Sequence, residues 1–294
     1  MLVRAPATVA NLGPGFDALA MAVDLWNEVE ADTAASPEVR VQGEGAGDLP
    51  EDASNLVFRA MAWLAREVGG ALPPFALRCR NHIPLERGLG SSAAAVVSGI
   101  VLADRLLGAE LGPDSLLEIA VDIEGHPDNV AACLRGGAAI AYLSRSGWRA
   151  EPLALHPDLR LAVLVPEHER LPTEDARRIL PRQVPLADAA FNAGRAALAV
   201  LALTERPELL PEAVEDRLHQ GRRLPLVPGA RAMFEELRAA GLPVCVAGAG
   251  PSLVAFEIEG RRVPNLGPGW RVLRLQPAAA GADVQDVEPP RGQP

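Results

Sequence analysis

Apolar residues recur with two different periods along the first third of the chain, and this pattern predicts strands that alternate with helices. Alternation of apolar and other side chains, which is typical of strands with one buried face, covers residues 1–9, 26–31, 39–42 and 75–80. Between residues 55 and 68 the spacing becomes three to four residues, which predicts an amphipathic helix that ends at Gly69-Gly70. Ser54 or Asn55 can cap its first turn.

Two more helices are predicted before residue 140. Residues 93–107 are apolar on every side, which is typical of a buried helix. A helix over residues 115–123 is predicted because Ser115-Leu116-Leu117-Glu118 has the form of a capping box. A strand over 138–143 follows.

The pattern changes near residue 150, after the turn-like run Ser144-Arg145-Ser146-Gly147. We therefore expect one domain over 1–150 and a second over 151–276. Strands in the second domain are predicted at 159–165, 243–247, 254–258 and 271–275, and helices at 173–178, 188–204, 208–219 and 230–240. Residues 277–294 are rich in Pro, Ala, Gly and acidic residues, so this tail is predicted to be disordered.

Composition narrows the possible partners and location. The 294 residues are 49% hydrophobic, which is ample for a core, and the net charge of −10 argues against nucleic acid and anionic membranes as partners. No apolar run reaches the ~20 residues of a membrane span. The three cysteines are odd in number and far apart, as expected for reduced thiols of a cytoplasmic protein.

Residues 84–94 combine a strand, a glycine loop and a helix start. This order can form an anion-binding cradle, because the first amides of a helix lack partners and carry partial positive charge. Gly88 and Gly90 would let a phosphate approach the backbone, and Ser91 and Ser92 add hydroxyls that could bind Mg²⁺. A tight turn with serine caps is the alternative.

The chain contains no lysine, so all 28 of its Lys and Arg residues are arginine. A Walker-type loop and a protein kinase each require a lysine at the nucleotide phosphates, so both classes are excluded. Schiff-base chemistry is excluded for the same reason. A nucleotide here must be held by backbone amides, a helix end and a metal ion.

Three other loops carry candidate chemistry. The run Asn11-Leu12-Gly13-Pro14-Gly15-Phe16-Asp17 is either a binding loop or an Asx-stabilised turn. The polar run Gly125-His126-Pro127-Asp128-Asn129 is either a site or a solvated connector. The run Gly248-Ala249-Gly250-Pro251-Ser252 either lines a site or allows close backbone packing. Arg177 and Arg223 could bind a carboxylate bidentately, or could be ordinary surface arginines.

The order of the 11–17, 88–93 and 248–252 motifs resembles the GHMP kinase superfamily. Within it the chain is similar to the homoserine kinase family, through Pro6-Ala7-Thr8 before the first loop, Glu124 before Gly125-His126-Pro127-Asp128-Asn129, Thr173 with Ala176-Arg177-Arg178, and Leu218-His219-Gln220 with Arg223. The resemblance spans residues 1–275. Departures are Gly221-Arg222, where the family commonly has Pro-Tyr, Ala247 in place of serine, and Glu86, which adds negative charge to the phosphate loop.

The resemblance implies an α+β fold of two domains, the first like ribosomal protein S5 domain 2 and the second ferredoxin-like. It implies ATP and Mg²⁺ as cofactors, with adenine near Asn55, Leu56 and Val57 and the metal between Ser92 and Glu118. Glu124 is the second choice for the metal. The residues implied to hold the nucleotide phosphates are Pro84, Leu85, Glu86, Arg87, Gly88, Leu89, Gly90, Ser91, Ser92, Ala93 and Ala94.

The resemblance also implies how L-homoserine would bind. Asp17 would bind its ammonium group, and Arg177 and Arg223 would bind its carboxylate. Asn11 would orient the hydroxyl, with His126 and Thr173 close by. Asp128 would be the general base, unless the enzyme uses none.

The implied reaction is ATP-dependent phosphorylation of L-homoserine to O-phospho-L-homoserine in threonine biosynthesis, by a cytoplasmic homodimer. Two alternatives stay open. One is another small-molecule kinase of the superfamily, of the mevalonate-pathway or shikimate type, whose substrate lacks an ammonium group. The other is a non-catalytic paralogue that senses metabolites.

Overall fold

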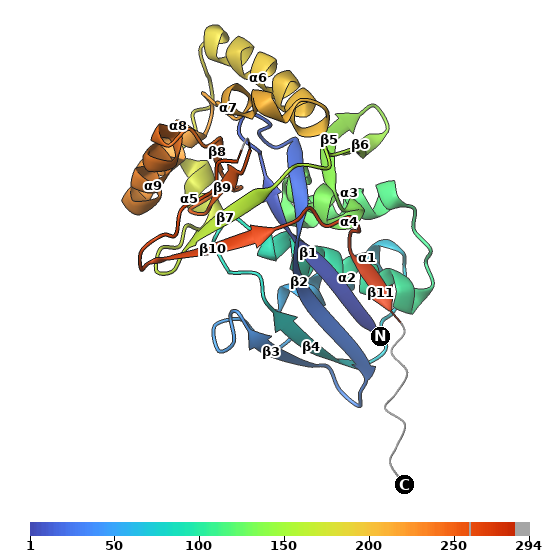
Figure 1. Cartoon of the computed structure of the whole chain (residues 1–294). Helices are drawn as coiled ribbons and strands as arrows, with labels where there is room; N and C mark the ends of the chain where they lie inside the picture. Colours follow the sequence, from blue (N-terminus) through green and yellow to red (C-terminus); the bar gives the residue numbers. More distant parts are fainter. Residues whose placement is uncertain (259, 286–294) are drawn as a thin grey trace.

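Two β-sheets organise the molecule in the computed structural model, which describes residues 1–258 and 260–285 (Figure 1). The first sheet has the order β11-β1-β2-β4-β3, and β5 and β6 extend it from β2. Its strands are β1 (Leu2–Ala10), β2 (Leu19–Thr33), β3 (Glu38–Gly43), β4 (Phe75–Asn81), β5 (Ala138–Ser144), β6 (Gly147–Leu153) and β11 (Asp283–Gln285). The pairing of β1 with β2 shifts register between Pro6 and Ala7, because a proline cannot donate to the ladder.

Four helices pack with the first sheet: α1 (Leu56–Glu67), α2 (Ser91–Leu107), α3 (Pro113–Glu124) and α4 (Pro127–Arg135). The central one, α2, is apolar on most sides and is enclosed by its neighbours, as its composition predicts. Gly99 allows α1 and α2 to approach closely, since a Cβ there would press on the Val57 carbonyl and on Ala60. Close packing of α2 fixes its N-terminus beside the loop 84–90.

The second sheet has the antiparallel order β10-β7-β9-β8. Numbered along the chain, this is 4-1-3-2, the strand order of a ferredoxin-like sheet. Its strands are β7 (Leu161–Pro166), β8 (Val244–Val246), β9 (Leu253–Phe256) and β10 (Trp270–Leu275). The helices between β7 and β8 are α5 (Thr173–Arg178), α6 (Leu186–Thr204), η1 (Pro207–Leu209), α7 (Leu210–Ala213), α8 (Gln220–Arg223), η2 (Leu224–Leu226) and α9 (Pro228–Ala239). The predicted α+β class is confirmed.

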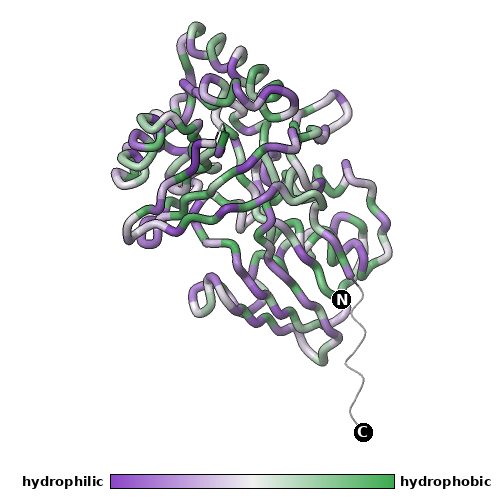
Figure 2. The backbone as a smooth tube through the Cα atoms, viewed as in Figure 1, coloured by the Kyte–Doolittle hydropathy of each residue, from purple (hydrophilic) through white to green (hydrophobic). Residues whose placement is uncertain are grey.

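One hydrophobic core joins the two sheets. It includes Val9 and Met21 from the first sheet together with Val163, Val254 and Phe256 from the second. Figure 2 shows apolar and polar residues alternating along the strands of the first sheet, as expected where one face is buried. The chain leaves the first sheet after β6 and enters the second at β7, so we propose a domain boundary between residues 153 and 161.

Two helix predictions were wrong in detail. Helix α3 begins at Pro113, with Gly112 as its N-cap, so Ser115 lies inside the helix and the expected capping box is not formed. The helix predicted over 208–219 is broken into η1 and α7, and it ends before Asp216. That buried carboxylate accepts hydrogen bonds from the amides of Leu218, His219 and Gln220, which replace the helical pattern.

The segment after Pro277 returns to the first sheet, so the prediction of disorder was wrong for residues 277–285. Strand β11 pairs with β1 through Leu2, Val3 and Arg4. The Ala278 amide donates to the Ala22 carbonyl over 2.9 Å, and the Ala282 amide donates to Cys133. Backbone pairing of this kind does not depend on a regular apolar pattern, and the small side chains of Ala278, Ala282 and Val284 pack against the protein as well. The rest of the predicted tail, 286–294, lies outside the described residues.

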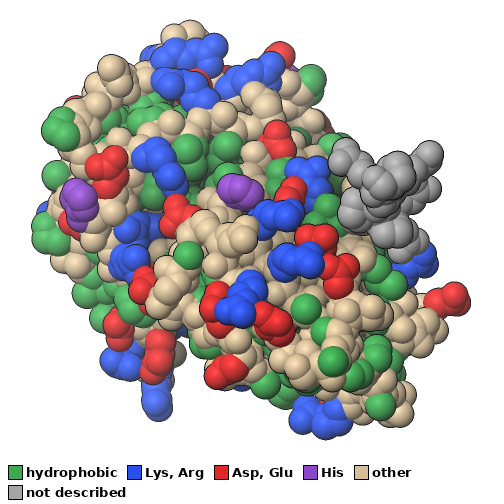
Figure 3. All heavy atoms as spheres, turned by 90° about the horizontal axis from the view of Figure 1, so that it is seen from below, with side chains coloured by type: hydrophobic (Ala, Val, Ile, Leu, Met, Phe, Trp, Pro, Cys, Tyr) green, Lys and Arg blue, Asp and Glu red, His purple; other side chains and the backbone are tan. Residues whose placement is uncertain are grey.

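The surface is mixed in charge. On the face that Figure 3 shows, basic and acidic side chains lie interspersed.

Cys79, Cys133 and Cys245 are free and buried, as expected. Helix α6 alone among the described helices is long and apolar enough to cross a membrane, with 22% of its apolar window buried, although the sequence pattern predicted no such run. One such helix is weak evidence of a membrane, because core helices of soluble proteins share these features.

Candidate active site

The loop that precedes α2 has the backbone of an anion cradle. Gly88 and Gly90 adopt positive φ angles of 72° and 68°. A Cβ at Gly88 would collide with the Ala247 carbonyl, and one at Gly90 would collide with the Thr8 hydroxyl, so only glycine fits either position. Gly90 is the N-cap of α2 and provides no side-chain cap, which leaves the first amides of the helix available to a ligand.

Arg87 anchors this loop to the second domain. Its guanidinium is buried and donates to the carbonyls of Leu85, Pro166 and Glu167. Burial lowers the pKa of Arg87, and the positive charge of Arg170 lowers it further. Because the Leu171 amide also donates to the Glu86 carbonyl, the loop is held between the two domains.

A first hollow lies on the α1 side of the loop. Its walls include Asn55, Leu56 and Val57, which were expected near adenine, and also Leu49 and Ala95. Asn55 is the N-cap of α1: its carbonyl oxygen accepts from the Val57 amide and its amide nitrogen donates to Pro50. Both polar groups of the Asn55 side chain are already hydrogen-bonded within the protein. Its predicted place near adenine therefore depends only on its position in the wall of this hollow.

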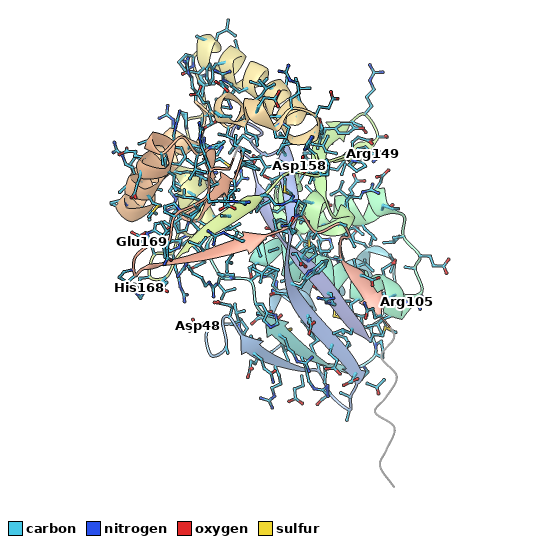
Figure 4. The ribbon with its side chains drawn as sticks, in the orientation of Figure 1. Asp48, Arg105, Arg149, Asp158, His168 and Glu169 are labelled. Carbon is cyan, nitrogen blue, oxygen red and sulfur yellow. The ribbon has the colours of Figure 1, made fainter. Side chains whose placement is uncertain are left out.

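The outer edge of this hollow is formed by both domains. Arg170 contributes to its wall, and its guanidinium lies 3.8 Å from the carboxylate of Asp48. Figure 4 labels Asp48 in the loop after β3 and His168 and Glu169 in the segment after β7 that carries Arg170. The contact between Arg170 and Asp48 brings these two segments together at the wall of the hollow.

A second hollow lies beside the loop over residues 84–90 and brings together most of the remaining predicted residues. Glu86, Ser91 and Ser92 line both hollows, so the two spaces meet at the start of α2. The second hollow is lined by Asn11, Asp17, Pro84, Glu86, Arg87, Gly88, Leu89, Gly90, Ser91, Ser92, Glu124, His126, Asp128, Asn129, Thr173, Arg177, Arg223, Gly248 and Ala249.

The loop from Asn11 to Asp17 is organised by the side chain of Asn11. The Asn11 carbonyl oxygen accepts from the Asp17 amide over 3.1 Å, and its amide nitrogen donates to the Gly248 carbonyl over 2.9 Å. Asn11 and Asp17 both have positive φ angles, 68° and 54°. Asparagine and aspartate tolerate this region better than most residues do. Both polar groups of Asn11 are thus engaged in holding the loop.

Charged groups converge on the far wall of the second hollow. Both terminal nitrogens of Arg177 donate to the Asp17 carboxylate, over 2.6 and 3.1 Å. Burial disfavours the protonated form of Arg177 and so would lower its pKa. The hydrogen bond from Arg177 to Asp17 and the negative charge of Asp17 outweigh this effect and raise the Arg177 pKa. Arg223 is 3% exposed and donates to the Gly248 and Ala176 carbonyls. Burial lowers the Arg223 pKa to about 10, so it stays charged at neutral pH.

Glu124, the second choice for the metal carboxylate, lies beside Ser92, and Glu118 does not. The Ser92 hydroxyl donates to the Glu124 carboxylate over 2.7 Å. Glu118 is exposed on α3, beside Gly147 of the β5–β6 hairpin, and it does not line the hollow. Glu124 follows Glu118 by six positions in the helix, so the two lie about 9 Å apart along the axis and on different faces.

A serine hydroxyl and a carboxylate suit a hard cation such as Mg²⁺, which prefers oxygen ligands and also binds nucleotide phosphates. Within residues 1–258 and 260–285, no group of three His, Cys, Asp or Glu side chains is arranged to hold a metal by itself. The pair of Ser92 and Glu124 therefore fits a cation that takes its other ligands from a nucleotide and water.

His126 lies between two carboxylates. Its Nδ1 is 3.5 Å from Asp128 and its Nε2 is 3.9 Å from Glu124. Burial opposes protonation of His126, but the interaction with Asp128 and the charge of Glu124 outweigh it and raise the His126 pKa. Burial also raises the pKa of Glu124. Asp128 is almost completely enclosed and accepts a hydrogen bond from the Asn129 amide.

Most predicted site residues thus surround two connected hollows. Leu85 lines the first hollow, while Ala93 and Ala94 line neither and pack into the core beneath the loop. Sequence analysis gave Thr8 no individual role beyond its place in the run Pro6-Ala7-Thr8, and its hydroxyl donates to Asn129 over 2.6 Å. Gly248 and Ala249 line the second hollow, which is one of the two interpretations left open for the run 248–252.

Comparisons with known proteins agree with one another. Residues 55–137 match the family described as GHMP kinases N terminal domain. The homoserine kinase of Streptomyces avermitilis is 46% identical over 289 residues, which cover 96% of this chain and 94% of that protein. The homoserine kinase of Mycolicibacterium vanbaalenii is 44% identical over 262 residues, 86% of this chain and 83% of that protein.

Solved structures share the fold. The crystal structure of homoserine kinase from Cytophaga hutchinsonii superposes with a TM-score of 0.81 at 28% identity and covers 96% of both chains. Phosphomevalonate kinase from Streptococcus pneumoniae superposes with a TM-score of 0.66 at 14% identity, over 87% of this chain and 91% of that one, and so shares the fold alone.

Proposed function

The chain belongs to the homoserine kinases of the GHMP kinase superfamily, and from this membership we propose that it is an ATP:L-homoserine O-phosphotransferase. The γ-hydroxyl oxygen of L-homoserine attacks the γ-phosphorus of ATP as the bond to the β,γ-bridging oxygen breaks. The products are O-phospho-L-homoserine, ADP and the hydroxyl proton. The observation that carries the proposal is one hollow that joins the phosphate loop to Asp17, Arg177 and Arg223.

The nucleotide would extend from the first hollow into the second. Adenine would lie against Leu56 and Val57, and the phosphates would meet the amides at the start of α2. Ser92 and Glu124 would hold Mg²⁺, which supplies positive charge to the phosphates when bound. Since Glu86 adds negative charge at this loop, backbone amides and the metal would carry most of the electrostatic stabilisation.

The amino acid would exchange partners with the protein. Its ammonium group would take the Asp17 carboxylate from Arg177, and the freed guanidinium would join Arg223 at the substrate carboxylate. Thr173 and His126 border the same space and would flank the chain that carries the hydroxyl. Asp17 provides one negative charge, and Arg177 and Arg223 provide two positive charges. This set favours an α-amino acid over mevalonate or shikimate, which lack an ammonium group.

Asp128 is the proposed base because it lies in the hollow and contacts His126. Transfer without a base is the alternative, in which positioning and electrostatics suffice and the hydroxyl proton leaves after the P–O bond forms. An Asp128→Asn variant distinguishes the two, since a general base contributes about 10²–10⁴-fold to kcat.

An assay of ADP release tests the proposed function. L-homoserine, L-threonine, L-serine, mevalonate and shikimate are each supplied with ATP and Mg²⁺. The highest kcat/KM is expected for L-homoserine. A preference for mevalonate or shikimate would favour another kinase of the superfamily, and ATP binding without turnover of any of them would favour a non-catalytic sensor.

Three broader parts of the proposal follow from family membership. The product would serve threonine biosynthesis, the enzyme would work in the cytoplasm without a nucleic-acid or membrane partner, and the chain would form a homodimer. Light scattering coupled to size-exclusion chromatography tests the last of these, because a mass of 31.0 kDa in solution would contradict it.

A further inference from the structure

His219 is completely enclosed, with 0% of its surface exposed, at the N-terminus of α8. Its side chain touches both parts of the amino-acid site. The ring Nε2 lies 2.8 Å from the Gly13 carbonyl oxygen, in the loop that carries Asn11 and Asp17. The ring Nδ1 lies 3.3 Å from Nη1 of Arg223.

These two partners fix where the ring carries its proton. A carbonyl oxygen only accepts, so Nε2 must carry the hydrogen that it donates to Gly13. A guanidinium only donates, so Nδ1 must be the unprotonated acceptor for Arg223. Burial lowers the pKa of His219, and this outweighs the opposing charge of the buried Asp216 carboxylate, which lies 3.8 Å from Nε2; the net downward direction agrees with a neutral ring. His219 is therefore a neutral Nε2–H tautomer at working pH.

The backbone that carries His219 is fixed from behind by Asp216. Both carboxylate oxygens of this buried residue accept hydrogen bonds from the following turn, at the amides of Leu218, His219 and Gln220. The Asn192 amide on α6 donates to the same carboxylate over 3.0 Å. The imidazole ring therefore has little freedom to rotate or shift.

The ring also packs on the substrate loop. Phe16 lies 5.4 Å from it, centroid to centroid, and the guanidinium of Arg223 lies 5.5 Å above the same phenyl ring. Loop 11–17, which belongs to the first domain, and Arg223 from the second are thus joined through one side chain. His219 thus contacts both the loop that carries Asp17 and the guanidinium of Arg223.

We propose that His219 is a positioning residue for amino-acid recognition, which sets the distance between the carboxylate-binding Arg223 and the ammonium-binding loop. The inference rests on the proposed function, because it assumes that a zwitterionic amino acid fills this space. Arg223 donates to His219, Gly248 and Ala176 at once, and these acceptors aim the rest of the guanidinium at the hollow. Loss of the acceptor on His219 would leave Arg223 positively charged, but its guanidinium would no longer be held in the orientation that binds the substrate carboxylate.

Two substitutions separate the two contacts. His219→Gln places an amide near the position of Nε2, so it keeps a donor for Gly13 and loses the acceptor for Arg223. His219→Asn places a carbonyl oxygen near Nδ1, so it keeps the acceptor for Arg223 and loses the contact with Gly13. His156→Gln, at a histidine between β6 and β7 that lines neither hollow, is the matched control.

The assay compares L-homoserine with 3-aminopropan-1-ol, which has the same amine and hydroxyl but no carboxylate. His219→Gln is expected to lower kcat/KM for L-homoserine by about ten- to a hundredfold, the usual effect of a bond to a charged group. It should change kcat/KM for 3-aminopropan-1-ol and KM for ATP by less than about twofold. His219→Asn is expected to lower kcat/KM for both alcohols by similar factors, because loop 11–17 serves both.

Equal losses for both substrates in His219→Gln would indicate a merely structural role and overturn the inference, as would no loss at all. A wild-type enzyme that is inactive on L-homoserine would instead overturn the proposed function. If neither variant folds, ¹⁵N spectra of the wild-type ring decide. An Nε2–H tautomer at neutral pH supports the inference, whereas an Nδ1–H or doubly protonated ring overturns it.

Discussion

Asp17 and Arg177 neutralise each other across the amino-acid site. They belong to different domains, and two hydrogen bonds join them directly. Both side chains keep about a third of their surface exposed, so solvent reaches the pair and weakens it. A zwitterion can therefore replace the pair, with one charge for each partner, without leaving a buried charge unpaired.

Replacing Asp17 with Asn tests this exchange. Asparagine keeps the shape of the side chain but removes the charge that would bind the ammonium group. We expect KM for L-homoserine to rise by about ten- to a hundredfold and KM for ATP to stay within about twofold. Asp122→Asn, at an exposed position of α3, is the control and should leave both constants unchanged. Equal rises in both KM values for Asp17→Asn would show that the aspartate is structural.

The choice between Glu118 and Glu124 gives a second test on single side chains. Glu124→Gln removes the carboxylate that contacts Ser92, so we expect the Mg²⁺ concentration for half-maximal rate to rise at least about tenfold. Glu118→Gln is the matched control on the same helix and should leave that concentration unchanged. Titration of MgCl₂ at saturating ATP measures both. A larger effect of Glu118→Gln would restore the assignment made from sequence.

At the scale of elements, most of the helices and strands could be predicted from the sequence, because their signals are local, but β6, β11 and helix α4 were missed. Helix α1, the buried helix α2 and the glycine turns depend on periodicity and backbone sterics within a few residues. Glu118 was preferred to Glu124 because the assignment came from spacing along the chain, which does not show which face of α3 meets Ser92.

Errors arose where distant segments supply the stabilising contacts. The turn after α7 is set by Asp216, which Asn192 on another helix helps to orient. Strand β11 forms because the free edge of β1, near the opposite end of the chain, accepts it. The composition of the tail does not show that a distant strand has a free edge to pair with. A segment rich in Pro, Ala, Gly and acidic residues was therefore predicted to be disordered.

The return of the chain to β1 predicts that residues 277–285 contribute to stability. Truncation after Gln276 removes the β11 pairing and the contacts of Ala278 and Ala282, and it exposes the edge of β1. With several hydrogen bonds lost at about 1 kcal/mol each, we expect the free energy of unfolding to fall by roughly 3 kcal/mol. Urea denaturation measures it. Truncation after Gln285 is the control, and equal stability of the two truncated chains would contradict the prediction.

At the scale of the whole molecule, the active site depends on two sheets that stay docked. Arg87 and Arg177 each join the domains by hydrogen bonds, and the Gly248 amide donates to the Ala10 carbonyl over 3.1 Å. The core beneath the site is continuous between the sheets. The core and these hydrogen bonds therefore hold the two domains in the relative position that substrate recognition needs.

A continuous core predicts that the two sheets unfold together, since neither can lose its packing without exposing the other. Three of the four tryptophans, Trp26, Trp63 and Trp148, report on the first sheet and its helices, and Trp270 reports on the second. Trp270→Phe and the triple variant with Phe at the other three positions isolate the two signals. For each variant we expect its fluorescence and its far-UV circular dichroism to give the same urea midpoint. If Trp270 fluorescence changed at a lower urea concentration than the circular dichroism of the same variant, the sheets would be separately folding units. The site between them would then have to assemble when ligand binds.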